Sequence, residues 1–421
     1  MEELEPEAKR QRASPTRPNS IVTWNYNGFI SRCTWNAPAM KQLLIDTKYP
    51  DMVCIQEARL KAFHANSRGR PLQSEYTATA VKDVVETIFA DYQPVWSLAD
   101  SRYAGTLTLL HKRLAFPVKT EAAFTVDGAI SLLLKKFHLT REQVGIMLDT
   151  PSRGSKATSP AKLPKQASIK SFFSPKKTSD NSAVDRSLQE HHHEGRFQFF
   201  CFSDMDVMQC YVPNNGTNEK SFERRREWDE MMLQFLKDRR KVLAKCSQEG
   251  RPLLWCGDFN VARDYRDGTH WEKHEDGTIY EFWTDPKKCS IGAQSSDSSI
   301  DPANIGIPSF TPAERKRFAE ILEEGDLVDV WRKLYPTGVS DLKLKPWERP
   351  NYTWRGHLAQ GSTYTAKFQG KAQRLDYFLI TPPQMLQEVN SCEILGYGEK
   401  REGHFCGSDH CATVLSIEGP F

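Results

Sequence analysis

The chain has 421 residues, of which 39% are hydrophobic and 11% aromatic, and 57 Lys and Arg nearly balance 54 Asp and Glu to give a formal net charge of +3. This composition fits a folded globular protein of one large domain or two smaller ones, and the charge balance alone does not indicate nucleic-acid binding. No apolar run approaches the roughly 18 residues that a membrane span needs, so we expect a soluble protein.

Two features bear on where the protein works. The 10 cysteines include no CxxC pair and follow no signal peptide, which favours reduced thiols in a nuclear or cytosolic protein. Residues 1–19 are polar and contain prolines, so we expect a disordered tail. Its basic cluster, residues 9–12, is typical of a nuclear-import signal. An equally good alternative is a solvated tail that no import receptor binds.

Short apolar runs dominate the first part of the chain. We expect strands at 20–24, 52–55, 92–96 and 105–111, and helices at 40–46 and 129–143. From residue 151 the composition changes, since residues 151–178 hold seven Lys and Arg and no acidic residue. No periodic apolar pattern crosses this stretch, so we predict a disordered insertion at about residues 150–193.

After the insertion the apolar runs resume. Residues 197–202 and 205–212 are predicted to form a hairpin, and 221–246 the clearest helix. Residues 253–256 are predicted to form a buried strand that Gly257 ends. A short helix at 318–322 and strands at 327–331, 352–354, 374–380 and 411–417 are expected to complete the chain.

Polar residues follow many of these strands. Each alone is more often a cap or a satisfied core group than a functional residue. Together they supply hard oxygen ligands for Mg²⁺, a general base and phosphate donors, which is the inventory of metal-assisted phosphate-ester hydrolysis. The set comprises Asn25, Asn27, Glu57, Tyr211, Asp258, Asn260, Asp376, Ser408, Asp409 and His410. A zinc site is the weaker alternative, since His404, Cys406, His410 and Cys411 match no common zinc spacing.

Six segments, in order, resemble the exonuclease III family of apurinic/apyrimidinic endonucleases, across residue 20 to about 112 and 197–417. They are Trp24-Asn25-Tyr26-Asn27-Gly28, Ile55-Gln56-Glu57, Tyr211-Val212-Pro213-Asn214, Gly257-Asp258-Phe259-Asn260-Val261, Arg374-Leu375-Asp376-Tyr377-Phe378 and Gly407-Ser408-Asp409-His410. Residues 310–315 also resemble this family's version of the fold. The insertion and the basic tail are most similar to the second eukaryotic class, which combines 3′-phosphodiesterase and 3′→5′ exonuclease activity with weaker abasic-site cleavage.

The resemblance implies an α/β fold, a four-layered sandwich of two packed β-sheets flanked by helices, as in deoxyribonuclease I. Residues 20–421 would form one catalytic domain interrupted by the insertion. Glu57 and Asp409 would hold Mg²⁺, or Mn²⁺ in its place, and Asp258 would orient or deprotonate the attacking water. Asn260, Tyr211 and His410 would donate to the phosphate, with Asp376 pairing with His410. The full metal-site set implied is Asn25, Asn27, Glu57, Asp258, Asn260, Asp409 and His410.

Two positions depart from the family. Gln373 stands where the endonucleases usually place a Trp that lines the abasic-sugar pocket, which weakens the expectation of strong endonuclease activity. Asn27 stands where some members have an aspartate, and one charge fewer is expected to loosen metal binding.

Two further sets of residues concern partners. Gln166, Ile169, Phe172 and Phe173 resemble the motif that docks on the sliding clamp, proliferating-cell nuclear antigen, because one tight turn would bring the three apolar side chains together. A chance match whose Phe pair packs on its own domain is the alternative. For DNA contact we expect Arg102, Tyr103, Arg263 and Arg266, with ordinary surface salt bridges as the alternative.

The sequence therefore predicts a monomeric, nuclear, Mg²⁺-dependent DNA-repair nuclease that acts at abasic sites and 3′-blocked ends in base excision repair. Two alternatives remain open. One is a phosphodiesterase of the same fold that acts on RNA, phosphoinositides or a protein–DNA adduct. The other is a clamp-binding scaffold with a dead nuclease fold, against which the filled catalytic positions speak.

Overall fold

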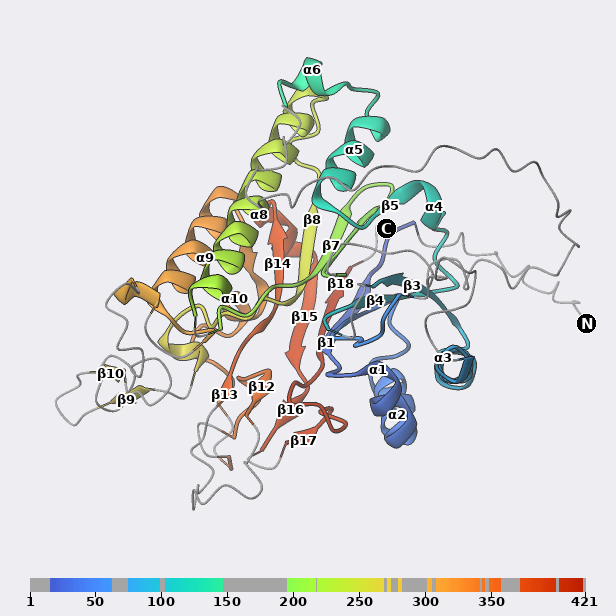
Figure 1. The fold of residues 1–421 in the computed structure, drawn as a ribbon, viewed down its shortest axis with the longest axis vertical. Helices are drawn as coiled ribbons and strands as arrows, with labels where there is room; N and C mark the ends of the chain where they lie inside the picture. Colours follow the sequence, from blue (N-terminus) through green and yellow to red (C-terminus); the bar gives the residue numbers. More distant parts are fainter. Residues whose placement is uncertain are drawn as a thin grey trace, which may run out of the picture.

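Two six-stranded β-sheets pack face to face and form the centre of the molecule (Figure 1). The computed structural model describes residues 16–62, 75–98, 103–146, 195–216, 218–268, 271–273, 279–281, 301–304, 308–340, 343–344, 348–356, 372–398 and 401–418. The predicted clamp motif, the predicted insertion and Arg102 lie outside these residues. Among the helices in the described part, none is long and apolar enough to cross a membrane.

The first sheet has the strand order β15-β18-β1-β2-β4-β3. Strands β1 and β2 run parallel, so that their carboxyl ends lie side by side with Asn25 opposite Gln56. Its strands are β1 (Ser20–Asn25), β2 (Met52–Gln56), β3 (Tyr92–Ser97), β4 (Thr106–His111), β15 (Val389–Ile394) and β18 (Thr413–Ile417).

The second sheet has the order β11-β14-β8-β7-β6-β5. Strands β7 and β8 are parallel and pair Tyr211 with Asp258, whereas β14 is antiparallel to β8 and pairs Asp376 with Asp258. The predicted hairpin is present as the antiparallel pair β6 and β7. The strands are β5 (Ala122–Ala123), β6 (Phe197–Cys201), β7 (Asp206–Tyr211), β8 (Leu253–Asp258), β11 (Val328–Asp329) and β14 (Asp376–Thr381).

Helices cover the outer face of each sheet and complete four layers (Figure 1). On the first sheet lie α1 (Phe29–Trp35), α2 (Ala37–Asp46) and α3 (Glu75–Ile88); on the second lie α5 (Val126–Lys136), α6 (Arg141–Val144), α8 (Glu219–Lys245) and α9 (Pro312–Glu324). A third apolar core fills the space between the sheets, with residues such as Met52, Val207 and Phe378. The predicted four-layered α/β sandwich is therefore confirmed.

Shorter elements lie at the rims of the sheets. They are the helices α4 (Val118–Glu121) and α10 (Val330–Leu334), and three two-stranded pieces: β9 (Trp271–Lys273) with β10 (Ile279–Glu281), β12 (Trp354–Arg355) with β13 (Ala372–Gln373), and β16 (Gly396–Tyr397) with β17 (Glu402–Gly403). The pair β12 and β13 matters most here, because an isolated bridge joins Trp354 to His410.

Several predicted bounds were wrong. The strand expected at 352–354 is β12, which covers Trp354 and Arg355 only. The helix expected at 129–143 is two helices, α5 and α6, and each has its own threonine N-cap, Thr125 and Thr140. The helix expected at 318–322 is longer than predicted and spans Pro312–Glu324; the expected N-terminal signal of Thr311 and Pro312 is confirmed, since Thr311 and Glu314 form a capping box. The strand expected at 327–331 covers two residues only, because the Asp329 side chain accepts from the Arg332 backbone N–H and starts α10.

Gly257 does not end its strand, contrary to prediction. β8 continues through Gly257 to Asp258 with Gly257 at φ 136°, a conformation that favours glycine. A Cβ atom there would lie 2.0 Å from the carbonyl oxygen of Cys210 on β7. The glycine thus lets the two parallel strands approach closely just before Asp258.

Most of the tail predicted for 1–19 lies outside the described residues, but its end packs on the fold. Arg17 is buried, lies 2.8 Å from a Glu388 carboxylate oxygen, and donates to the Glu418 carbonyl at 3.0 Å. The packed part of the chain therefore begins before Ser20.

Candidate active site

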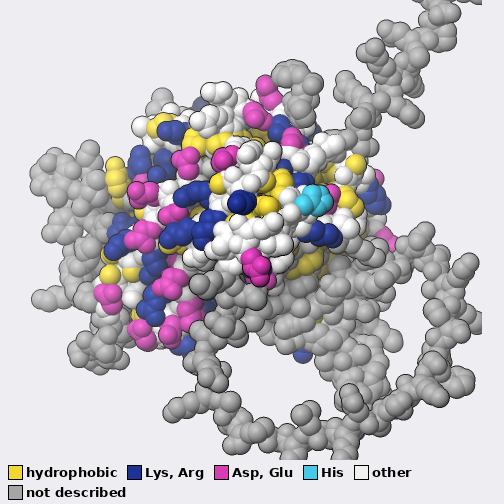
Figure 2. All heavy atoms as spheres, turned by 90° about the horizontal axis from the view of Figure 1, so that it is seen from above, with side chains coloured by type: hydrophobic (Ala, Val, Ile, Leu, Met, Phe, Trp, Pro, Cys, Tyr) yellow, Lys and Arg dark blue, Asp and Glu magenta, His cyan; other side chains and the backbone are white. Residues whose placement is uncertain are grey.

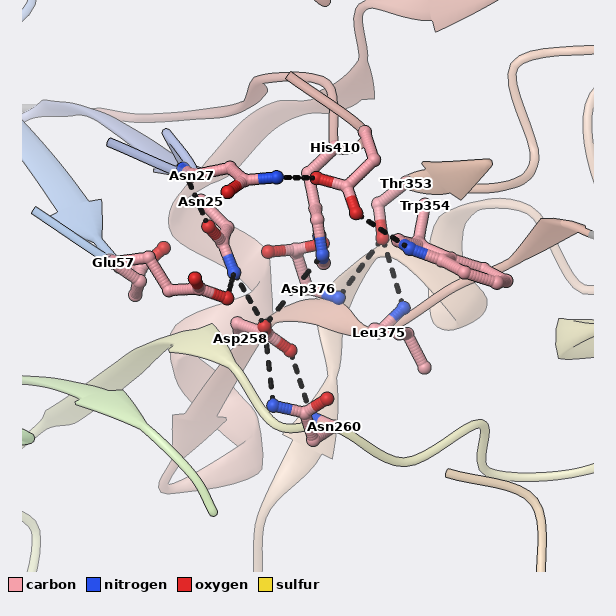
Figure 3. A network of polar contacts seen from close by, with 12 residues as sticks. Asn25, Asn27, Glu57, Asp258, Asn260, Thr353, Trp354, Leu375, Asp376 and His410 are labelled. Carbon is pink, nitrogen blue, oxygen red and sulfur yellow. Dashed lines mark hydrogen bonds and ion pairs between the residues drawn. The ribbon is translucent and has the colours of Figure 1, made fainter. Parts of the chain in front are cut away.

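The polar residues predicted from strand ends meet at one edge of the two sheets (Figure 3). This follows from topology, because β1, β2, β7 and β8 all end at this edge, while the antiparallel β14 begins there with Asp376. Parallel strands bring their carboxyl ends together, so residues far apart in sequence become neighbours.

Asn25 links two carboxylates. Its side-chain amide nitrogen donates to Glu57 Oε1 at 3.0 Å and to Asp258 Oδ2 at 2.9 Å. The Tyr211 hydroxyl donates to the same Glu57 oxygen at 2.8 Å, and Arg59 Nε donates to Glu57 Oε2 at 2.7 Å. Burial raises the pKa of Tyr211 well above its usual value, with Glu57 adding to the shift, so the phenol stays protonated and remains a donor.

Asp258 is 1% exposed and held by several donors. The backbone N–H of Asn260 donates to Oδ1 at 2.8 Å, and the Asn260 side chain lies 3.4 Å from Oδ2. That side chain also donates to the Val212 carbonyl at 2.9 Å. Burial raises the pKa of Asp258 to about 7, with Asp376 adding to the shift and His410 opposing it. A carboxylate with a pKa near neutrality is suited to act as a general base.

His410 lies between two carboxylates. Its Nδ1 is 2.8 Å from Asp376 Oδ2, the contact expected from the family resemblance, and its Nε2 is 3.9 Å from Asp258 Oδ2. Burial alone would lower the pKa of His410, but Asp376 and then Asp258 outweigh it and raise the pKa to about 10. The ring is therefore an imidazolium at neutral pH, and 3.9 Å is too long for a hydrogen bond. Its Nε2 proton is thus left for another acceptor.

Asp409 is held from both sides. Asn27 donates to Oδ1 at 2.9 Å and the Trp354 indole N–H donates to Oδ2 at 3.2 Å (Figure 3 labels both donors). Ser408 secures the segment, because its hydroxyl donates to the Asn25 carbonyl at 2.7 Å and accepts from the His410 N–H. Asp409 is thereby oriented toward the same edge as Glu57.

Three residues of this edge adopt left-handed backbone conformations. The φ angles are 51° at Asn27, 50° at Glu57 and 48° at Asn260. Non-glycine residues rarely adopt this conformation, and those that do are often found at functional sites. Here the turn re-aims each side chain directly after its strand.

The residues present fit a hard divalent cation. Glu57 and Asp409 offer carboxylate oxygens, and Mg²⁺ binds through one or two carboxylates while it keeps several waters. Among the described residues, Asp258, Asp376 and His410 also lie close enough together that they could hold a metal ion. His404, from the zinc alternative, pairs instead with Asp46 at 2.9 Å.

Of the residues predicted to contact DNA, Tyr103 has an exposed ring, whereas the two described arginines form ion pairs with aspartates. Tyr103 is 50% exposed, and its ring lies near the Arg196 guanidinium that also covers Tyr211. Arg263 and Arg266 instead form ion pairs with Asp329 at 3.5 Å and Asp264 at 2.6 Å, which matches the salt-bridge alternative. On the face seen in Figure 2, Lys and Arg side chains are interspersed with Asp and Glu.

Thr353 and Trp354 are site residues that the sequence reasoning missed. The Thr353 hydroxyl accepts the N–H groups of Leu375 and Asp376 and so fixes the start of β14 (Figure 3). Trp354 packs on a small apolar cluster formed by Ala262, Phe310 and Leu375. The signal was present in the sequence, since 352–354 was predicted as a strand that ends in a polar and an aromatic residue.

Gln373 lies close to this apolar cluster in the fold. It is 2% exposed, pairs with Trp354 across β12 and β13, and bridges to Gly268. Its side-chain amide nitrogen has no hydrogen-bond partner among the described residues. A polar amide thus replaces the aromatic surface that the family resemblance leads one to expect.

Residues 22–410 match the model of the Endonuclease/Exonuclease/phosphatase family. The chain is 28% identical over 416 residues to a DNA-(apurinic or apyrimidinic site) endonuclease of Arabidopsis thaliana, covering 96% of this chain and 86% of that protein. It is 26% identical over 430 residues to a protein of the same description from Plasmodium falciparum (isolate 3D7), covering 94% of this chain and 54% of that protein. It thus spans about half the length of the Plasmodium relative.

The fold is similar to that of a solved structure as well. The crystal structure of AP endonuclease LMAP from Leishmania major superposes with a TM-score of 0.53 at 18% identity, covering 96% of this chain and 89% of that one. An exodeoxyribonuclease of Bacillus subtilis (strain 168) is 24% identical over 230 residues, which cover 55% of this chain and 67% of that protein. Since the family model spans most of the chain, this protein belongs to the Endonuclease/Exonuclease/phosphatase family.

Proposed function

We propose that this protein is a DNA-repair nuclease that hydrolyses phosphodiester bonds at abasic sites and at blocked 3′ ends. The relatives described as DNA-(apurinic or apyrimidinic site) endonucleases and exodeoxyribonuclease support it. The observation that carries it is the network in which Asn25 joins the Asp258 and Glu57 carboxylates while Asp258 faces the His410 imidazolium. A base, a cation and a metal ligand thus share one edge, as phosphodiester hydrolysis requires.

Glu57 and Asp409 would hold the metal ion, Mg²⁺ with Mn²⁺ as a substitute. When bound, the ion polarises the phosphate and neutralises the charge that develops on it. The donors around the two carboxylates, Asn25 and Tyr211 on Glu57 and Asn27 and Trp354 on Asp409, fix the directions of the ligand oxygens. Such supporting hydrogen bonds commonly tune metal affinity.

Asp258 would take the proton of the attacking water. Its raised pKa and its position beside the strand ends suit that task, and attack on phosphorus leaves a 3′-hydroxyl. His410 would donate from Nε2 to a phosphate oxygen, while Asp376 keeps the ring charged and oriented. We give Asn260 and Tyr211 positioning roles instead of phosphate donation, because their donor groups already bind Val212, Asp258 and Glu57.

We further propose that 3′ ends are processed faster than internal abasic sites are incised. Trp354, which is only partly buried against the cluster of Ala262, Phe310 and Leu375 and forms a bridge with His410, would offer its ring to the sugar next to His410. Gln373, which is 2% exposed and pairs with Trp354, stands where the family resemblance leads one to expect the Trp that lines the abasic-sugar pocket. Without this Trp, the site would hold an extruded internal sugar less well, whereas a terminal sugar needs no extrusion from the duplex.

The test compares the whole chain on three duplexes, with an internal abasic site, a recessed 3′-phosphoglycolate and a mismatched 3′ end, each with Mg²⁺ and with Mn²⁺. We expect 3′-hydroxyl products on all three, faster turnover at the 3′ ends, and loss of all three reactions in Asp258→Asn. The proposal is wrong if no DNA is cleaved with either metal, or if Asp258→Asn cleaves as the unaltered chain does.

The nuclear location and the partner belong to the same proposal. The support is the basic cluster at 9–12 and the motif of Gln166, Ile169, Phe172 and Phe173. We propose that a monomer of this protein docks on the sliding clamp and works in base excision repair in the nucleus. The double variant Phe172→Ala/Phe173→Ala should lose clamp binding in a pull-down with purified clamp while it keeps nuclease activity; unchanged binding would remove the clamp from the proposal.

A further inference from the structure

Tyr103 sits on a loop that is fastened to the loop of Glu57. The carbonyls that follow it, of Ala104 and Gly105, accept the N–H groups of Arg59 and Ala58 at 3.0 and 2.9 Å. Ala104 and Gly105 both have positive φ, so the chain turns sharply at this point. Half of the Tyr103 side chain remains exposed. An exposed aromatic ring thus lies one loop away from a proposed metal ligand, and backbone hydrogen bonds fix the two residues that follow it.

Arg196 connects this exposed ring to Tyr211. The carbon at the centre of its guanidinium lies 5.1 Å from the Tyr103 ring centroid and 4.5 Å from that of Tyr211. Its Nη1 donates to the Tyr211 carbonyl at 3.0 Å, and the Tyr211 N–H donates to the Arg196 carbonyl at 2.9 Å. Arg196 itself is 1% exposed. A planar cation is thus buried against two aromatic faces, an arrangement that is favourable once water is excluded.

Tyr211 passes the contact on to the site. Its hydroxyl donates to Glu57 Oε1 at 2.8 Å, the oxygen that also accepts from Asn25. The order of contacts is therefore Tyr103, Arg196, Tyr211, Glu57. If the Tyr103 ring tilts, the Arg196 guanidinium must either tilt with it or lose its contact with the ring. Either change alters the contact between Arg196 and Tyr211.

We propose that Arg196 is a positioning residue that couples the stacking of an unpaired nucleobase of the DNA substrate on Tyr103 to the placement of the Tyr211 hydroxyl against Glu57. This inference rests on the proposed nuclease function. Aromatic side chains stack with any base, so the contact is sequence-tolerant, as a repair nuclease requires. Nearby Arg224, whose guanidinium is 6.0 Å from the Tyr103 ring centroid, adds positive charge for the phosphates.

The matched pair Arg196→Lys and Arg224→Lys tests the coupling. Both keep the charge and lose the planar fork, but among the described contacts Arg224 reaches Tyr103 alone, whereas Arg196 reaches Tyr211 too. With a 3′-mismatched duplex we expect Arg196→Lys to lower kcat by roughly tenfold, because the phenol is misplaced. Arg224→Lys should change KM only, and its salt dependence should stay the same because the charge is kept. Equal effects of the two variants on kcat would overturn the inference.

A double-mutant cycle with Tyr103→Ala separates coupling from simple support of Tyr211. Tyr103→Ala should raise KM by roughly tenfold and also lower kcat at saturating DNA, and the kcat loss should vanish in the Arg196→Lys background. Additive kcat losses would overturn the coupling. If Arg196→Lys fails to fold, Tyr103→Ala alone still tests the proposal, because Tyr103 is surface-exposed. A change in KM without any change in kcat in that variant would refute the proposal. Failure of the unaltered chain to cleave any DNA would instead refute the proposed function.

Discussion

Two buried clusters of charged residues lie on either side of the start of β14, and they differ in how their charges are matched. In the first, Arg374 pairs with Asp267 at 2.7 Å and with Asp329 at 2.6 Å, and Arg332 also pairs with Asp267, so two buried cations meet two buried carboxylates. In the second, the single cation His410 faces the two carboxylates of Asp258 and Asp376. Arg374 and Asp376 stand two residues apart, and each belongs to one cluster.

The balance of charge shows in the pKa values. Burial alone would raise the pKa of Asp329, but Arg374 outweighs it and holds that pKa below its ordinary value. Burial raises the pKa of Asp258 to about 7, and the opposing charge of His410 does not cancel that shift. A matched cluster stabilises its charges in the fold, whereas an unmatched one leaves a group ready to exchange a proton near neutral pH. We therefore assign the Arg374 cluster to structure and the Asp258 cluster to chemistry.

The largest expected effect is that of Asp258→Asn. The amide cannot accept the proton of the attacking water, so single-turnover cleavage of a 3′-mismatched duplex should fall by roughly 10³-fold. Thermal melting should show no loss of stability, because a buried group with a raised pKa is removed. Asp264→Asn, which alters a carboxylate paired with the surface residue Arg266, is the control and should cleave normally. A destabilised but active Asp258→Asn protein would reverse our assignment.

Arg374→Met should have the opposite profile. It removes a buried guanidinium partner from both Asp267 and Asp329, which keep only Arg332 and Arg263 respectively, and this costs about 3 kcal/mol of the free energy of unfolding. Denaturant titration measures that loss. The fraction that stays folded should retain most of its kcat, since Arg374 does not contact Asp258 or His410 among the described contacts. A stable variant that cannot cleave DNA would place Arg374 in the active site.

Lowering the pH should separate the two clusters in one protein. Asp258 accepts a proton only as the carboxylate, whose pKa is about 7, so cleavage should fall roughly tenfold per pH unit below that value. His410 stays a cation below about 10, so the rate should fall again above that pH. The pKa of Asp329 is lowered in the fold. The stability that its ion pair contributes is therefore present at any pH above the ordinary pKa of an aspartate, and it is lost only in strong acid.

A pH–rate profile together with melting at about pH 8 and pH 5 checks this. We expect activity to decline over that interval while the contribution of the Asp329 pair to stability persists. Asp376→Asn should shift the alkaline limb to lower pH, because it removes the main charge that raises the pKa of His410. An alkaline limb that does not move in this variant would mean that another group controls it.

The smallest effect expected is that of Trp354→Phe. The ring keeps its packing on Phe310 and Leu375 but loses the N–H donated to Asp409. A hydrogen bond to a charged group contributes about 1.5 kcal/mol, so the Mg²⁺ concentration for half-maximal rate should rise by roughly tenfold. Trp35→Phe, at a residue that is 77% exposed, serves as the control. An unchanged Mg²⁺ requirement would argue that Asp409 needs no support from Trp354.

The sequence predicted much of the site because its residues obey a local rule: each follows a buried strand. Asn25, Glu57, Tyr211 and Asp258 all stand at or just past the carboxyl ends of parallel strands, where topology brings polar side chains together. The left-handed turns at Glu57 and Asn260 and the glycine requirement at position 257 were not predicted. The glycine requirement arises from the close approach of β7 to β8, which no single stretch of sequence encodes.

By itself the sequence determined the layered fold, the family and the set of side chains available for chemistry, since hydrophobic periodicity and short motifs are local properties. Only the tertiary structure decided what each polar residue touches. It pairs Arg374 with Asp329 but Asp376 with His410, although Arg374 and Asp376 are two residues apart. It also places the Trp354 indole against Asp409, and Arg196 against both Tyr103 and Tyr211. These contacts join segments far apart in the chain, and charge matching in a buried cluster depends on such neighbours rather than on residue type.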